Sequence, residues 1–259
     1  DIGEFTLLIA LATAIYGCVA YIMAARGNRI DLYLSADKTP LIVWGCVMIS
    51  SICLWRAFLT NDFSLQYVWA YSNIELDTFY KFASFWGGQK GSLLFWTLLL
   101  TTYTVVVHFQ NRKKNLRVVP YAMAVLLTII IFFLCLVNFS TNPFERIPLP
   151  PEDGRGLNPL LQNYWMVIHP PTLYLGYVGF TVPFAFAVAA LISKNLDDGW
   201  IRLTRKWTLI SWFFLCMGNL FGASWAYVEL GWGGYWAWDP VENAAFMPLL
   251  IATAFLHSV

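Results

Sequence analysis

The chain has 259 residues, of which 59% are hydrophobic and only 12% are charged, and its mean hydropathy is +0.59. Soluble domains usually carry about 25% charged residues, so this composition excludes an ordinary water-soluble domain and also a disordered chain. The 16 basic and 15 acidic residues nearly cancel, which leaves no excess positive charge for binding nucleic acid. We therefore predict an all-α, polytopic membrane protein.

Six apolar stretches are long enough to cross a bilayer, because a membrane helix needs about 20 residues. A seventh apolar segment begins near Ala244 and has only about 16 residues before Val259, so we expect it to be a truncated span. Since the chain opens on Asp1 rather than Met, we expect a piece of a longer protein and treat residues 1–259 as a single membrane domain. The six predicted spans cover residues 5–25, 41–59, 91–110, 119–138, 172–193 and 207–224.

The segments between the predicted spans differ in charge. Three, four and four basic residues follow the first, third and fifth spans, respectively. The positive-inside rule places these segments in the cytoplasm and the N-terminus outside. The opposite segments, residues 60–90, 139–171 and 225–243, are long and rich in aromatic residues. Because loops of unusual composition often carry function, we expect the chemistry on the outer face.

Cysteine chemistry and soluble-enzyme motifs are not expected in this chain. All five cysteines lie within predicted spans and form no CxxC pair, so we interpret them as small buried apolar residues. The sequence contains no P-loop, no GxGxxG and no GxSxG motif. Intramembrane acidic residues that would mark an ion pathway are also missing, which gives no support to a transporter.

Two of the three histidines lie at predicted span ends. His108 is at the inner end of the third span, where we expect its imidazole to bind lipid headgroups or water. His169 precedes Pro170 and Pro171 at the mouth of the fifth span. Proline disfavours the helical conformation in the residue before it and suits the first turn of a helix, so His169 is predicted to be extended at the outer surface. Such an imidazole is a candidate haem ligand; the alternative is an interfacial histidine without a ligand.

His257 lies in the seventh apolar segment, where a polar imidazole needs a partner. That partner is either a bound metal group or a neighbouring helix. If the helix begins near Pro240, His257 lies about 25 Å along its axis. His169 and His257 are therefore predicted to belong to two separate sites.

The segment of residues 225–243, here called the tryptophan loop, contains Trp232, Trp236 and Trp238 among several glycines. Glycines permit tight turns and indoles offer flat apolar faces, so the loop suits a planar hydrophobic ligand. The alternative is an aromatic belt that only anchors the protein at the membrane surface. Asp239, followed by Pro240 and Glu242, is predicted to form a capping box that opens the seventh helix.

Three motifs follow one another in the chain: the tryptophan- and glycine-containing segment 85–96, the segment 158–162 with the downstream run 169–177, and residues 231–243. In this order they resemble the CcmF family of cytochrome c-type biogenesis haem lyases and the closely related NrfE proteins. The tryptophan loop resembles the WWD domain of the wider haem-handling superfamily. The resemblance extends over the whole chain, as the N-terminal part of a longer family member.

The resemblance implies a haem lyase that joins the thiols of apocytochrome c CxxCH motifs to the vinyl groups of haem. It implies that His169 is an axial ligand of substrate haem and that His257 is an axial ligand of a resident haem b within the membrane. Both partner histidines would lie beyond Val259. The surface against which substrate haem lies is implied to include Trp232, Trp236, Trp238 and Asp239.

The implied partners are the haem chaperone CcmE, a CcmH-type subunit that handles apocytochrome, and apocytochrome c. The implied location is the bacterial inner membrane, with the functional loops on the periplasmic side. The alternatives are a system II or nitrite-reductase-specific paralogue, an exporter of haem or another small molecule, and a scaffold without activity.

Overall fold

The computed structural model describes residues 1–27, 29–111, 117–195, 199–231 and 233–258, and these residues contain helices but no named strand. Six helical segments are long and apolar enough to cross a membrane: Ile2–Gly27, Ile30–Leu59, Gln89–Asn111, Val119–Ser140, Tyr164–Ser193 and Gly199–Glu229. Each contains one of the six predicted spans, so the all-α, polytopic membrane fold is confirmed.

The chain divides into two compact units, each described separately below. Unit 1 contains Asp1–Leu157 and Phe184–Asp197, and unit 2 contains Asn158–Pro183 and Asp198–Val259. The single membrane domain over residues 1–259 stays a prediction.

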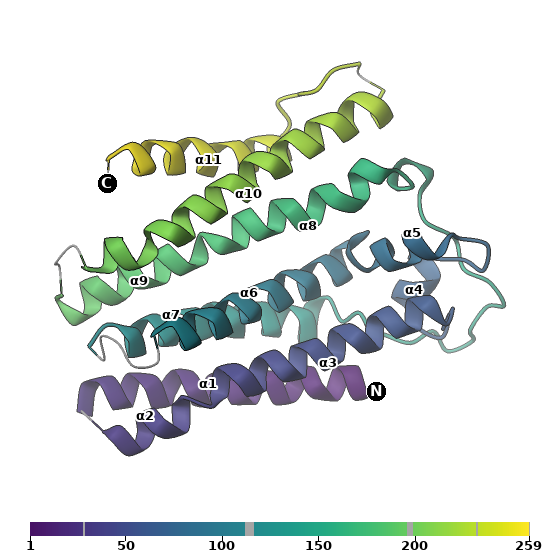
Figure 1. Cartoon of the computed structure of the whole chain (residues 1–259). Helices are drawn as coiled ribbons and strands as arrows, with labels where there is room; N and C mark the ends of the chain where they lie inside the picture. Colours follow the sequence, from purple (N-terminus) through teal and green to yellow (C-terminus); the bar gives the residue numbers. More distant parts are fainter. Residues whose placement is uncertain (28, 112–116, 196–198, 232, 259) are drawn as a thin grey trace. The chain divides into compact units, whose positions relative to one another are not determined.

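Unit 1 is built around four long helices: α1 (Ile2–Gly27), α3 (Thr39–Leu59), α6 (Gln89–Asn111) and α7 (Val119–Cys135). Helix α1 packs on α3 and α7, and α6 packs on the same two helices (Figure 1). Small residues permit the close approach: a Cβ at Gly17 would lie 2.3 Å from Oγ1 of Thr39. Trp96 of α6 stacks on Phe133 of α7, with ring centroids 5.3 Å apart.

The remaining elements of unit 1 lie at the ends of this bundle or continue its helices. Helix α2 joins α1 to α3 at one end, and α4 and α5 lie at the other end, where α1 begins (Figure 1). Their bounds are α2 (Ile30–Ala36), α4 (Gln66–Tyr71), α5 (Thr78–Ala83), the 3-10 helix η1 (Ser84–Trp86) and the π-helix η2 (Leu136–Ser140). Helix α9 (Thr181–Ser193) belongs to both units, because its first three residues are part of unit 2 and the rest are part of unit 1.

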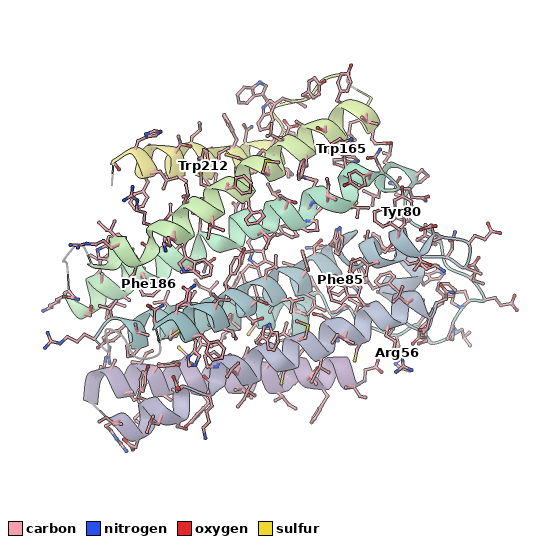
Figure 2. All side chains as sticks on the ribbon, viewed as in Figure 1. Arg56, Tyr80, Phe85, Trp165, Phe186 and Trp212 are labelled. Atoms are coloured by element: carbon pink, nitrogen blue, oxygen red, sulfur yellow. The ribbon has the colours of Figure 1, made fainter. Side chains whose placement is uncertain are left out.

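Residues 60–90, which we expected to be an outer loop, contain the short helices α4 and α5 and the 3-10 helix η1. Asp77 starts α5 by accepting a hydrogen bond from the backbone N–H of Phe79 at 2.8 Å. The aromatic residues then pack on the bundle: Trp55 of α3 stacks on Phe82 and on Phe85, at centroid distances of 5.2 and 4.3 Å. The segment is therefore folded against α3 (Figure 2 labels Phe85).

His108 is not at the lipid headgroups, and that prediction was wrong. Its side chain is only 3% exposed, and its Nδ1 lies 3.5 Å from Oδ1 of Asp37, which is also buried. Asp37 follows the last residue of α2, so the α2–α3 turn covers the end of α6. The imidazole is part of the packing of unit 1.

The five cysteines are free, as expected, but they are half-buried rather than buried. Cys18 of α1 places its Sγ 3.3 Å from Oγ1 of Thr128 of α7. This thiol takes part in a polar contact between two helices. Our interpretation of the cysteines as apolar residues did not include such a contact.

Unit 2 contains α8 (Tyr164–Gly179), α10 (Gly199–Glu229) and α11 (Pro240–Ser258), preceded by the 3-10 helix η3 (Pro159–Leu161). Helix α10 packs on both α8 and α11. Helix α11 has 19 residues and is not one of the six membrane-crossing segments, so its crossing of the membrane stays a prediction. Between α10 and α11, Trp212 Nε1 donates to Oγ1 of Thr253 at 2.8 Å (Figure 2 labels Trp212).

Candidate functional site

The candidate site lies where α8 and α10 come closest. A Cβ at Gly176 of α8 would lie 2.3 Å from the backbone N of Leu215. A Cβ at Gly218 of α10 would lie 2.6 Å from the Cα of Leu173. Small residues allow membrane helices to approach at backbone distance, so the two glycines fix α8 against α10.

His169 is helical, and our prediction of an extended residue was wrong. Helix α8 begins at Tyr164, because Asn163 accepts a hydrogen bond from the backbone N–H of Trp165 at 2.8 Å. Asn163 is itself held by Glu229 at the end of α10, with 2.6 Å between Nδ2 and Oε1. This cap starts the helix before His169, and both following prolines lie inside the helix. Tertiary contacts thus outweigh the preference that a proline imposes on its predecessor.

The imidazole of His169 is held by α10. Its Nδ1 lies 2.8 Å from the carbonyl oxygen of Gly218, which can only accept a hydrogen bond, so Nδ1 carries the proton. The ring fits because residue 222 is glycine: a Cβ there would lie 2.6 Å from Cε1 of His169. The indole of Trp225 stacks on the imidazole at a centroid distance of 6.3 Å. That indole donates its own N–H to the carbonyl oxygen of Leu160 at 3.1 Å.

A cavity of about 100 Å³ opens beside this imidazole, within unit 2. It brings together three of the predicted site residues, His169, Trp236 and Asp239. Nε1 of Trp236 is buried and has no hydrogen-bond partner among the described residues. A buried donor without a partner is uncommon, and this one belongs to a residue that lines the cavity. Trp165, at this end of α8, is labelled in Figure 2.

The predicted N-cap at Asp239 is confirmed. Oδ1 of Asp239 accepts a hydrogen bond from the backbone N–H of Glu242 at 2.7 Å, and α11 begins at Pro240. The second half of the predicted capping box differs: Oε2 of Glu242 accepts from the backbone N–H of Ala237 at 2.8 Å rather than from that of Asp239. Both hydrogen bonds fix the start of α11 and the end of the tryptophan loop.

Trp238 does not line the cavity but contacts Trp236, which does. Its indole is 67% exposed, and it packs edge-on against Trp236, with centroids 5.7 Å apart. Both rings contact Phe246 of α11. Its backbone φ of +57° is unusual for a residue other than glycine, and the amide of Asn243 holds its carbonyl at 3.1 Å. The predicted site residue Trp232 lies outside the described residues.

His257 lies in the last turn of α11 and is exposed. It does not line the cavity, which is bordered by the first turns of the same helix, from Val241 to Ala245. The axial rise from Pro240 to His257 is about 25 Å. The structure therefore separates the two histidines, and the described residues contain no cluster of three potential metal-binding side chains.

Comparisons with known proteins give the family of the chain. Residues 86–259 match the family described as "Cytochrome C assembly protein". The chain belongs to this family. It is 42% identical to cytochrome c-type biogenesis protein CcmF of Escherichia coli over 260 residues, which is 100% of this chain and 40% of that protein. It is 41% identical to NrfE of Haemophilus influenzae over 259 residues, 100% of this chain and 41% of that protein.

A solved structure named "Cytochrome c Heme Lyase CcmF" is similar to the chain, with a TM-score of 0.86 and 35% identity. The match covers 99% of this chain and 41% of that one. The chain thus spans about two fifths of the length of the relatives that it matches. The chain is a member of the CcmF and NrfE branch of the family.

Sequence reasoning missed the glycines and the indole that hold His169. Gly218 and Gly222 form a G-x-x-x-G pattern inside an apolar span, which is a known signal for close helix packing. That pattern could have located the contact of α10 with α8. The stacking of Trp225 on His169 had no sequence signal, because the two residues are 56 positions apart (225 − 169).

We expect Asp239→Ala to destabilise the start of α11 by about 1 kcal/mol, because the loss of an N-cap acceptor typically costs that amount. Asp239→Asn is the matched control, since asparagine also caps helices. Thermal unfolding of the purified protein in detergent measures the difference. Equal stability of the alanine and asparagine variants would show that the cap contributes nothing.

Proposed function

We propose that this chain is the haem-binding part of a cytochrome c haem lyase, and that His169 binds the iron of substrate haem at the outer face. The observation that carries the proposal is the fixed imidazole of His169. Its Nδ1 proton is engaged by the carbonyl of Gly218, which leaves Nε2 as the nitrogen with a free lone pair. A histidine that ligates a metal commonly donates its other nitrogen in this way.

The surrounding residues fit a haem. The lone pair of an imidazole nitrogen lies in the ring plane, so the stacked indole of Trp225 does not cover it. The cavity of about 100 Å³ is smaller than ligand pockets of about 300–1,000 Å³. This volume cannot enclose a macrocycle, so His169 and the exposed indole of Trp238 are the residues that would hold one.

The reaction proposed for the complete protein is the addition of two apocytochrome thiols to the vinyl groups of haem. Each S–H bond adds across a C=C bond, so a thioether forms and nothing leaves. Haem supplies the reactive vinyl carbons, and the nucleophiles belong to the substrate protein. The residues of this chain hold and orient: His169 fixes the iron, and the tryptophan loop limits how the ring can lie.

We propose that His257 ligates a resident haem b at a second, deeper site. The support is its place in the last turn of α11, about 25 Å from the helix start, and its exposed imidazole. The second ligand at each site would come from the part of the protein outside this chain.

The proposed partners are the haem chaperone CcmE, a CcmH-type subunit and apocytochrome c. We propose that the protein lies in the bacterial inner membrane with its N-terminus and tryptophan loop on the periplasmic side. In unit 1, α1 ends and α2 begins in the basic stretch around Arg26 and Arg29, away from α4 and α5 (Figure 1). That separation supports the cytoplasmic assignment of the basic segments.

An absorption spectrum of the full-length protein, purified with its haem chaperone, tests the proposal. A haem lyase is expected to show the sharp reduced bands of bis-histidine haem. An exporter is expected to move haem across vesicles that lack apocytochrome, and a scaffold is expected to carry no haem. Haem flux without any thioether formation would contradict the proposed function.

We expect Gly222→Ala to weaken haem binding at the outer site. The new Cβ would lie 2.6 Å from Cε1 of His169, so the imidazole must turn away from the carbonyl of Gly218. Loss of such a supporting contact typically lowers metal affinity by about 10- to 100-fold, which haem titration of the full-length protein measures.

Gly45→Ala is the matched control for this variant, because Gly45 also lies in a membrane helix and a Cβ there would meet nothing within 4 Å. Normal outer-site haem affinity in Gly222→Ala would show that the position of the imidazole is not set by this glycine.

A further inference from the structure

One motif of the sequence has no role in the proposed haem sites: the tryptophan- and glycine-containing segment 85–96. In the structure two of its three glycines, Gly88 and Gly91, make room for tyrosines of α4. A Cβ at Gly88 would lie 2.3 Å from Cζ of Tyr71, and a Cβ at Gly91 would lie 2.6 Å from the hydroxyl oxygen of Tyr67. That hydroxyl also accepts a hydrogen bond from the backbone N–H of Gly88 at 3.0 Å. The motif thus fixes α4 against the start of α6.

This junction borders a cavity of about 300 Å³, which lies entirely within unit 1. Ligand-binding pockets have volumes of about 300–1,000 Å³, so the cavity is large enough for a small group. Its lining combines aromatic rings, two side-chain amides and two cations, and carries no acidic residue: Gln66, Tyr67, Trp69, Ala70, Tyr71, Gln89, Lys90 and Arg155.

Arg155 is held in place at the cavity without an ionic partner. Its guanidinium lies over the indole of Trp69, 4.3 Å from the ring centroid, and its backbone N–H donates to the carbonyl of Trp69 at 2.8 Å. The next residue, Gly156, has φ of +83° and donates its N–H to Ser72 at 3.0 Å. Within the described part of the chain, Arg155 makes no ion pair. Stacking covers one face of the guanidinium and leaves its edge N–H groups available.

Lys90 adds a second cation, whose charge is partly balanced by the carboxylate of Glu145. Its Nζ donates to Oε1 of Gln66 at 2.8 Å and to Oε2 of Glu145 at 2.5 Å. An ammonium group has three donors, so one remains for a ligand. The two contacts also keep the flexible lysine in one position, which lowers the entropic cost of binding.

We propose that this cavity binds a carboxylate side chain of an acidic peptide segment from a partner protein. A guanidinium edge matches a carboxylate through two parallel hydrogen bonds, and Lys90 can add a third. The aromatic rings offer flat surface to the apolar part of the peptide, and the amides of Gln66 and Gln89 can pair with its backbone. The site is distinct from the haem sites of unit 2 and does not depend on them.

The test uses the full-length protein in nanodiscs of neutral lipid and a peptide, Gly-Phe-Glu-Glu-Gly, that carries an uncharged dye. Fluorescence anisotropy is expected to report binding that weakens with salt and is absent for the peptide Gly-Phe-Gln-Gln-Gly. Arg155→Gln is expected to weaken binding by about tenfold or more, since hydrogen bonds to charged groups are strong. Arg155→Lys keeps the positive charge but not the paired N–H groups of the guanidinium, and it is expected to lose less peptide affinity than Arg155→Gln.

Arg56→Gln is the matched control, because Arg56 is exposed at the end of α3 and borders a different cavity (Figure 2). It is expected to bind the peptide like the wild type, and haem spectra are expected to be unchanged in all variants. Equal binding of both peptides, or full binding by Arg155→Gln, would overturn the proposal. So would equally effective competition by inorganic phosphate or by anionic lipid in the nanodisc, since either would indicate a general anion site.

Discussion

His169→Ala in the full-length protein is expected to block cytochrome c maturation while the resident haem stays in place. The variant removes the only imidazole that borders the cavity in unit 2, and with it the proposed ligand of substrate iron. The loss should exceed the roughly 10- to 100-fold effect that is typical of a supporting residue around a metal. Haem staining of periplasmic c-type cytochromes measures maturation, and the reduced absorption spectrum measures resident haem.

Tyr164→Ala provides the control for this experiment. Tyr164 is the first residue of the same helix and is 59% exposed, so its truncation should leave α8 and maturation intact. Normal maturation in His169→Ala would contradict the assignment of His169 as the ligand of substrate haem. Loss of the resident haem in that variant would indicate that the two sites are not separate.

His257→Ala is expected to abolish the resident haem. A bis-histidine haem loses an axial ligand in this variant, and no other histidine lies in α11. The sharp reduced bands should disappear from the purified full-length protein while its amount in the membrane stays normal. Maturation should fall with them, because the second site is proposed to belong to the same haem lyase.

Ser258→Ala is the matched control, since Ser258 is the next residue and is also exposed. A full complement of resident haem in His257→Ala would contradict the assignment of this histidine. Loss of resident haem with unimpaired maturation would instead show that the second site is not needed for the reaction.

The spans and the start of α11 could be predicted from the sequence because local signals decide them. Long apolar runs favour helices in a bilayer whatever their neighbours. The carboxylate of Asp239 accepts a hydrogen bond from a backbone N–H only three residues further along the chain, so this cap needs no distant contact.

The environments of His169 and His108 depended on distant residues and could not be predicted locally. His169 is helical because Asn163, held by Glu229, starts α8 before it. The conformational preference of a residue before proline does not include such a contact. His108 is buried because Asp37, far away in sequence, folds over it.

The segment 60–90 shows the same limit. We predicted an outer loop there, but Trp55 of α3 stacks on two of its aromatic rings. The composition indicated that the segment was unusual. Its helices and its cavity depend on packing against other elements, which composition does not show.

Chemical rescue of His169→Gly tests directly whether Nε2 of His169 binds the iron of substrate haem. Electron paramagnetic resonance of oxidised haem, delivered by the chaperone to the full-length protein, reports the axial ligands. We expect the outer-site low-spin signal to be lost in this variant and to return when imidazole is added. An outer-site signal identical to that of the wild type in the variant without imidazole would contradict the claim.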